Sequence, residues 1–199
     1  HPLYRHFGKL MDKIVAREKL EISNDRKVLL FFGFIRKYKG LDILIEAVSL
    51  LKDNSYTILI AGESYEDVKF LDDKLVECGI ENERVSKHVK YIPDEEVKVY
   101  FSASDLCILP YRSATQSGIA SIAKHFEIPM VVTPVGELSN EVSHCVNGYV
   151  CSEVNAVAVA EGIEYSMNKR QEFIVNQKRD NENNTFENFG LKLIDFLKC

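Results

Sequence analysis

Blocks of consecutive apolar residues alternate along the chain with blocks in which apolar residues recur every three or four positions. The first kind predicts strands buried on both faces, because a strand covered on one face alternates apolar and polar side chains. The second kind predicts helices with one apolar face. We expect strands at 27–33, 56–62, 88–92, 105–110, 128–135 and 148–151. We expect helices at 9–22, 39–52, 65–78, 94–103, 118–126, 153–168, 169–178 and 184–198.

The alternation of strands and helices predicts an α/β fold, with a doubly wound parallel sheet of about six strands covered on both faces. In such a sheet, with strand order 3-2-1-4-5-6, ligands bind where the order reverses, at the carboxyl ends of the first and fourth strands. Two loops follow these strands: GFIRKYKG at 33–40 and PYRSATQSG at 110–118. The fold therefore predicts a ligand site between them.

The two loops differ in their chemistry. The first carries Arg36, Lys37 and Lys39, and the second carries small and hydroxyl residues up to Gly118, where a helix is expected. Cationic side chains facing the free N–H groups of a helix start would bind a diphosphate. Two plainer interpretations stay open, namely that the basic residues form a solvated loop and that Ser117 only caps the helix.

Composition narrows the class of protein. The 199 residues are 46% hydrophobic and 28% charged, with a net charge of -5, which is typical of a globular protein and disfavours a nucleic-acid partner. No apolar run approaches the ~18 residues that span a bilayer. The five cysteines lack metal-ligand spacing, so we expect no metal and a reduced, cytoplasmic setting. The opening His1-Pro2-Leu3-Tyr4 has neither an initiator Met nor a signal peptide pattern, and we interpret it as the interior of a longer protein.

Several common catalytic motifs are missing from the sequence. The first strand is not followed by GxGxxG, and there is neither a GxxxxGK[ST] loop nor a GxSxG elbow. No nucleophile–base arrangement can be argued, so the catalytic residues stay unknown. The polar stretch 168–188 is interpreted as a solvated face or linker.

Four blocks in order carry a resemblance to a known family. They are FFGFIRKYKGLDILIEAV (31–48), AGES (61–64), VKYIPDEEVKVYFSASDLCILPYRSATQSG (89–118) and IPMVVTPVGELSNEVSHCVNGYV (128–150). Together they resemble the C-terminal, donor-binding domain of family-four (group 1) glycosyltransferases, which have the two-domain GT-B fold. The resemblance implies a Rossmann-like nucleotide-sugar-binding domain at 1–180. It also implies a C-terminal helix at 181–199 that returns toward an N-terminal acceptor domain absent from this sequence.

The resemblance also implies the site residues. The donor diphosphate would contact Gly33, Arg36, Lys39, Ser117, Gly118 and Ile119. The donor sugar or ribose would contact Ser113, Thr115 and Gln116, and the base would lie at Tyr91, Ile92 and Pro93. Arg36 is a substitute at a shifted position, because Phe34 stands where the family has an arginine. Asp105 matches a family position that we interpret as structural.

The chain departs from the family at a pair of acidic positions. Most members carry two glutamates seven residues apart, whereas Ala114 or Thr115 falls near the first and Ile122 or Ala123 near the second. Neutral groups select a sugar differently from a carboxylate. Glu137 likewise replaces the second glycine of the family's VGG.

By this resemblance, the protein is the donor half of a retaining, metal-independent hexosyltransferase of bacterial polysaccharide or glycoconjugate synthesis. Its partners would be a UDP or GDP sugar and the absent N-terminal domain, with no other cofactor, and the domain alone would bind without turnover. The lost glutamates keep open a non-catalytic sugar-nucleotide-binding or interaction domain, and a sugar-nucleotide 2-epimerase is a further alternative. The expected location is cytoplasmic, with peripheral association of the full-length enzyme at the inner face of the membrane left open.

Overall fold

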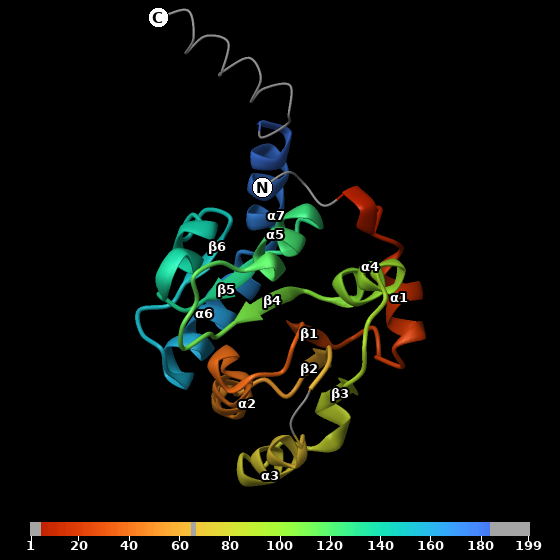
Figure 1. Cartoon of the computed structure of the whole chain (residues 1–199), viewed down its shortest axis with the longest axis vertical. Coiled ribbons are helices and arrows are strands. Elements are labelled where there is room, and N and C mark those ends of the chain that lie inside the picture. Colours follow the sequence, from red (N-terminus) through yellow and green to blue (C-terminus); the bar gives the residue numbers. More distant parts are fainter. Residues whose placement is uncertain (1–4, 65–66, 184–199) are drawn as a thin grey trace, which may run out of the picture.

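The computed structural model describes residues 5–64 and 67–183, the side chains of Arg5 and Asn183 excepted. A six-stranded, all-parallel sheet in the order β3-β2-β1-β4-β5-β6 forms its centre (Figure 1). The α/β class and the strand order predicted from the sequence are therefore confirmed. The strands are β1 (Lys27–Phe32), β2 (Tyr56–Ala61), β3 (Val85–His88), β4 (Leu106–Leu109), β5 (Met130–Val132) and β6 (Gly148–Val150).

Helices cover both faces of the sheet. The α-helices are α1 (Lys13–Lys19), α2 (Leu41–Leu50), α3 (Lys69–Glu77), α4 (Asp94–Ala103), α5 (Gly118–His125), α6 (Ala156–Asn168) and α7 (Arg170–Asn183). The short 3₁₀ helices are η1 (Arg5–Phe7), η2 (Lys37–Lys39), η3 (Asn82–Arg84) and η4 (Gly136–Glu141).

Successive residues of the strands enter two separate cores. Leu30 packs in a core with α1, α4 and α5, whereas Leu29 and Phe31 pack in the opposite core with α2, α3 and α6. Figure 1 shows α1 and α4 beside each other on one side of the sheet. Because every residue of β2 and β4 is buried, these strands need the continuous apolar runs seen in the sequence.

One predicted strand is misplaced, and one interpretation of a polar stretch is settled between its alternatives. The third strand is Val85–His88 and not 88–92, because this edge strand is polar and the apolar residues that marked a strand lie in the loop after it. Over its described part, the stretch 168–188 is a solvated face rather than a linker, since α7 occupies 170–183, extends the helix predicted at 169–178 and buries only Phe173 and Gln177. The predicted boundary at 180 falls within α7, and the helix expected at 184–198 lies outside the described residues.

A buried ion cluster fixes the amino end of β4. Asp105, which is 5% exposed, accepts hydrogen bonds from Arg17 Nη2 at 2.8 Å, Lys13 Nζ at 2.5 Å and the Val28 N–H at 2.7 Å. Arg170 Nε lies 3.4 Å from its Oδ1. One carboxylate thus ties α1, β1 and α7 to β4, in keeping with a structural role for Asp105.

Candidate functional site

The loops that follow β1 and β4 are in direct contact. Gly40 has φ 68°, and a Cβ atom built on it would lie 2.0 Å from the carbonyl oxygen of Pro110. The Arg112 N–H donates to the Tyr38 carbonyl at 2.7 Å. The strand order thus brings the two loops together as predicted, and only glycine permits so close an approach at position 40.

A salt bridge fastens the same contact at the surface. Arg112 donates from Nη1 and Nη2 to the two carboxylate oxygens of Asp42, at 2.7 and 2.6 Å, and from Nη1 to the Lys37 carbonyl at 3.0 Å. Burial opposes ionisation of Asp42, but Arg112 holds the pKa of that carboxyl below its usual value. Nothing in the sequence indicates this pair, because its two residues stand seventy positions apart.

Lys39 is the buried cation of the site. Its side chain ends 3.1 Å from where a Cβ on Gly33 would lie, and Ile119 Cδ1 lies at the same distance from that point. Lys39 is 7% exposed, and burial lowers the pKa of its ammonium to about 8. No carboxylate among the described residues forms an ion pair with it. The structure therefore brings together Gly33, Lys39 and Ile119, three residues expected at the diphosphate.

Tyr111 lies beneath Lys39 and was missed as a site residue. Lys39 Nζ sits 5.6 Å from the centroid of the Tyr111 ring, close enough for a cation–π interaction. Burial raises the pKa of the Tyr111 hydroxyl well above its usual value, and the pKa of the neighbouring Cys107 thiol to about 12. Both groups are neutral at pH 7, so neither offers Lys39 an anion. An aromatic residue directly after a buried strand gives no sequence signal beyond a core position.

The amino end of α5 faces the same region. Ser117 is the N-cap, and its Oγ accepts a hydrogen bond from the Ala120 N–H at 3.3 Å. No described residue accepts a hydrogen bond from the N–H of Gly118 or Ile119. A Cβ built on Gly118 would meet no atom within 4 Å, so the space beside this helix end is open. Free N–H groups at a helix start attract anions.

The residues predicted for the sugar lie on the outer part of the second loop. Ser113, Thr115 and Gln116 are exposed. The loop is supported from behind by Gly136 (φ 49°), where a Cβ atom would lie 1.8 Å from the carbonyl oxygen of Ala114. The role of Ser113, Thr115 and Gln116 at a donor sugar stays a prediction.

The residues predicted for the base, and Arg36, lie in two separate segments of the chain. Tyr91 is 65% exposed and Ile92 is buried in the loop after β3, while Pro93 precedes α4 as its N-cap. Arg36 precedes η2 in extended backbone and is half-buried. Ile92 shares a hydrophobic core with Tyr111. No hydrogen bond or ion pair between described residues joins Tyr91, Ile92 or Pro93 to the two loops, so their part in base binding stays a prediction, as does the part of Arg36.

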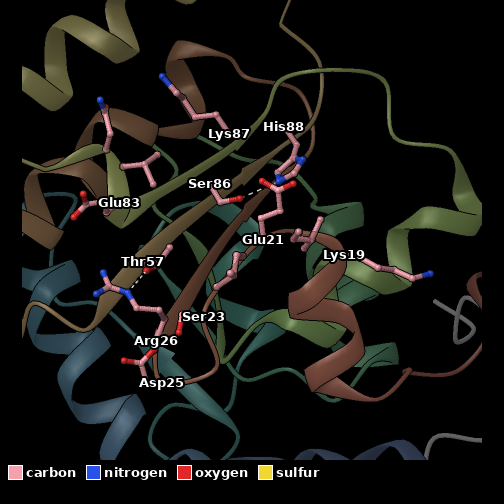
Figure 2. Close-up of a pocket in the computed structure, with 14 residues that line it drawn as sticks. Lys19, Glu21, Ser23, Asp25, Arg26, Thr57, Glu83, Ser86, Lys87 and His88 are labelled. Atoms are coloured by element: carbon pink, nitrogen blue, oxygen red, sulfur yellow. Dashed lines mark hydrogen bonds between the residues drawn. The ribbon is translucent and has the colours of Figure 1, made fainter.

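A groove of about 810 Å³ lies elsewhere, along β3 and the segment between α1 and β1 (Figure 2). Arg26 Nε donates to Thr57 Oγ1 at 2.7 Å, and Ser86 Oγ lies 2.9 Å from His88 Nε2. Acidic and basic side chains line it together, so it favours no single class of ligand. None of the predicted site residues lines this groove.

Two further properties concern only the described residues. No three His, Cys, Asp or Glu side chains among them gather as a metal centre requires. None of their helices has the length and apolar character needed to cross a membrane.

The family model and the curated relatives that match this chain point to one family. The family model for "Glycosyl transferases group 1" matches residues 12–194. An uncharacterised glycosyltransferase of Methanocaldococcus jannaschii is 24% identical over 193 residues, which cover 94% of this chain and 48% of that protein. The chain spans half or less of the length of the curated relatives it matches.

Two solved structures share the fold. The C-terminal domain of a group 1 family protein, LpcC of Francisella tularensis, matches with a TM-score of 0.72 at 19% identity, covering 87% of this chain and 92% of that one. Anabaena HepE in complex with UDP-glucose matches with a TM-score of 0.79 at 20% identity, covering 96% of this chain and 54% of that one. The described fold is thus that of a glycosyltransferase C-terminal domain.

Proposed function

Because the chain belongs to the group 1 glycosyltransferase family, we propose that it binds the nucleoside diphosphate of a sugar donor between its loops 33–40 and 110–118. A retaining, metal-independent hexosyltransferase would use this domain to hold the donor while an N-terminal domain presents the acceptor. Turnover then requires both halves, and the present domain binds without transfer.

One observation carries the proposal. Among the described residues, Lys39 is buried without a carboxylate partner, its ammonium and the Ile119 side chain both adjoin Gly33, and the N–H groups of Gly118 and Ile119 at the start of α5 have no acceptor. Burying an unpaired ammonium costs free energy, which lowers its pKa. A diphosphate would supply the missing negative charge to Lys39 and hydrogen-bond acceptors to both N–H groups.

The same groups have a role in the reaction. As the glycosyl bond breaks, negative charge grows on the distal phosphate of the leaving nucleotide. Lys39 and the amino end of α5 would stabilise that charge from fixed positions, which is how preorganised donors lower a barrier. The protein groups alone would then do what a divalent cation does elsewhere, and this is the basis for proposing metal independence.

The nucleotide is proposed by analogy with a structural relative. HepE was solved with UDP and with UDP-glucose, which favours a UDP sugar over a GDP sugar here. Synthesis of a bacterial polysaccharide or glycoconjugate remains our proposal for the pathway, in the cytoplasm or at the inner face of the membrane.

The test is calorimetric titration of the 199-residue chain with UDP, GDP, ADP and CMP in the presence of EDTA. We expect one nucleoside diphosphate to bind, and binding to weaken in Lys39→Ala and Arg36→Ala. Loss in Lys39→Ala alone would remove Arg36 from the site. Binding that appears only when a divalent cation replaces EDTA would contradict metal independence.

The exposed neutral side chains of Thr115 and Gln116 favour a second candidate. Without a carboxylate for the sugar, the domain could serve as a non-catalytic sugar-nucleotide-binding module. Assays on the full-length protein separate the two functions: an enzyme transfers or slowly hydrolyses the sugar of a bound donor, whereas a binding module releases it intact.

A further inference from the structure

Arg112 holds the segment around Lys39 at three points, two before it in the chain and one after it. The Arg112 N–H donates to the Tyr38 carbonyl at 2.7 Å, and Arg112 Nη1 donates to the Lys37 carbonyl at 3.0 Å. On the other side of Lys39, Nη1 and Nη2 donate to the two carboxylate oxygens of Asp42 at 2.7 and 2.6 Å. One residue of the second loop therefore fixes the backbone from which the Lys39 side chain leaves.

Arg112 also belongs to the loop that leads into α5. It follows Tyr111, whose ring centroid lies 5.6 Å from Lys39 Nζ, and the loop continues from it to Ser117, the N-cap of α5. Arg112 thus links the cation of the proposed site to the helix end that presents free N–H groups.

This link lies at the surface and not in a core. The side chains of Arg112 and Asp42 are 37% and 36% exposed. Exposed ion pairs contribute little to stability, because water screens both charges. A guanidinium that meets both oxygens of a carboxylate does, however, fix the relative position of the two groups. The pair is therefore better suited to hold two loops in register than to stabilise the fold.

We infer that Arg112 is a positioning residue for the nucleoside diphosphate, acting through Asp42 and the backbone on both sides of Lys39. This inference rests on the proposed function. With the link intact, Lys39 and the amino end of α5 keep their separation before the ligand arrives. Without it, binding has to order both loops, and the free energy of that ordering is subtracted from the affinity.

Asp42 separates this inference from a simple effect of charge. It stands in the first turn of α2, directly after the loop that carries Lys39. By electrostatics alone, replacing a carboxylate near an anion site by a neutral amide strengthens anion binding. If Asp42 acts by holding Arg112, the same replacement weakens anion binding. Position and charge thus predict opposite signs for Asp42→Asn.

The test is calorimetric titration of the 199-residue chain and of Arg112→Gln, Arg112→Lys, Asp42→Asn and the double variant Arg112→Gln/Asp42→Asn. Each is titrated with UDP and UMP, and with GDP and GMP. We expect every single substitution to weaken diphosphate binding about three- to tenfold, the range of ordering one or two side chains. Binding of the monophosphates, which lack the distal phosphate, should stay unchanged.

Two of the variants sharpen the result. Arg112→Lys keeps the charge, but an ammonium cannot bridge both carboxylate oxygens and a carbonyl, so it should bind as weakly as Arg112→Gln. The double variant should bind as the single variants do, because all of them break one interaction.

Asp53→Asn is the matched control. It removes the same charge and breaks an exposed pair with Lys27 at the start of β1, the opposite end of the sheet, so nucleotide binding should not change. The melting temperature of every variant should fall by less than about 4 °C, as expected for exposed ion pairs. If Arg112→Gln folds poorly, Arg112→Lys and Asp42→Asn decide the question.

Unchanged or tighter diphosphate binding in Asp42→Asn would overturn the inference. So would an Arg112→Lys variant that binds like the unmodified chain, because Arg112 would then act by its charge, or equal losses for diphosphates and monophosphates. Absence of any nucleotide binding by the unmodified chain would instead overturn the proposed function, and the inference with it.

Discussion

The two ends of the sheet treat buried positive charge in opposite ways. At the amino end, Arg17 and Lys13 share the carboxylate of Asp105, which also accepts the Val28 N–H. At the carboxyl end, Lys39 is also buried, at 7% exposed against 3% for Arg17, but has no carboxylate partner in the described structure. Compensated charge stabilises a fold, whereas uncompensated charge lowers stability until a ligand supplies the counter-charge. The difference separates the structural end of the domain from the end where we propose that the nucleotide binds.

We expect the largest effect on stability from breaking the buried ion cluster of Asp105 at the amino end of the sheet. Asp105→Asn leaves Arg17 buried without its counter-charge, and we expect a loss of about 3–5 kcal/mol in the free energy of unfolding. Urea denaturation followed by circular dichroism measures it. Asp72→Asn, which breaks an exposed pair with Lys87, is the control and should cost less than about 1 kcal/mol. Equal effects of the two substitutions would refute the contrast.

Removing the unpaired charge of Lys39 should raise the stability of the domain and lower its affinity for a nucleoside diphosphate. Lys39→Met deletes a buried ammonium of depressed pKa, so we expect unfolding at pH 7 to cost about 1–3 kcal/mol more. Nucleoside diphosphate binding should weaken about 10- to 100-fold, because a charge-assisted contact is lost. Thermal melting and calorimetry give the two quantities. Lys37→Met, an exposed lysine of the same loop, should change neither by much, and a Lys39→Met variant that is less stable would argue against the burial cost.

A smaller effect is expected at the start of α5. The open space beside Gly118 would hold an added methyl group without a clash, so Gly118→Ala should fold normally. The methyl would occupy the path to the N–H groups, and we expect diphosphate binding to weaken about tenfold. Gly40→Ala is the contrasting variant, since its Cβ would lie 2.0 Å from the Pro110 oxygen and should destabilise the fold itself. Unchanged binding in Gly118→Ala would move the phosphate away from this helix end.

The smallest effect is a dependence on pH. With the pKa of Lys39 at about 8, nucleotide affinity should be about fourfold lower at pH 8.5 than at pH 7, because the binding form is protonated. Stability should change in the other direction. Between pH 8 and about 10 the unfolded chain holds this proton and the folded one does not, so the free energy of unfolding rises with pH. Titrations over this range should show both trends, and both should vanish in Lys39→Met.

The fold was largely predictable, because the central strands are apolar throughout. β2, for instance, buries all six of its residues, so its sequence leaves little choice of structure. The misplaced strand β3 lies at the edge, where Ser86 and Lys87 satisfy the backbone geometry without an apolar pattern. The helix α7 was predicted only as far as residue 178, because its composition is polar and Phe173 and Gln177, one turn apart, are its only fully buried positions in the described part.

The site was predictable only where topology and residue type coincide. Lys39 and Gly118 follow strands that the sheet places side by side, so their meeting could be expected. The position of Tyr111 beneath Lys39 could not, because an aromatic residue directly after a buried strand signals no more than a core position. The salt bridge of Arg112 with Asp42 was equally hidden, since it joins exposed residues that ordinary surface composition would supply.

The sheet ends on two short strands, and this affects how the domain behaves in solution. β3 has four residues and β6 three, whereas the two adjoining strands β1 and β2 have six each. Unpaired backbone at the side of a sheet invites another chain to add a strand, which is a common start of aggregation. Short edge strands leave few unpaired backbone groups for an added strand, and Lys87 places a charged side chain on one of them. The domain is thus less prone to add strands from other chains than an open parallel sheet with long edge strands would be.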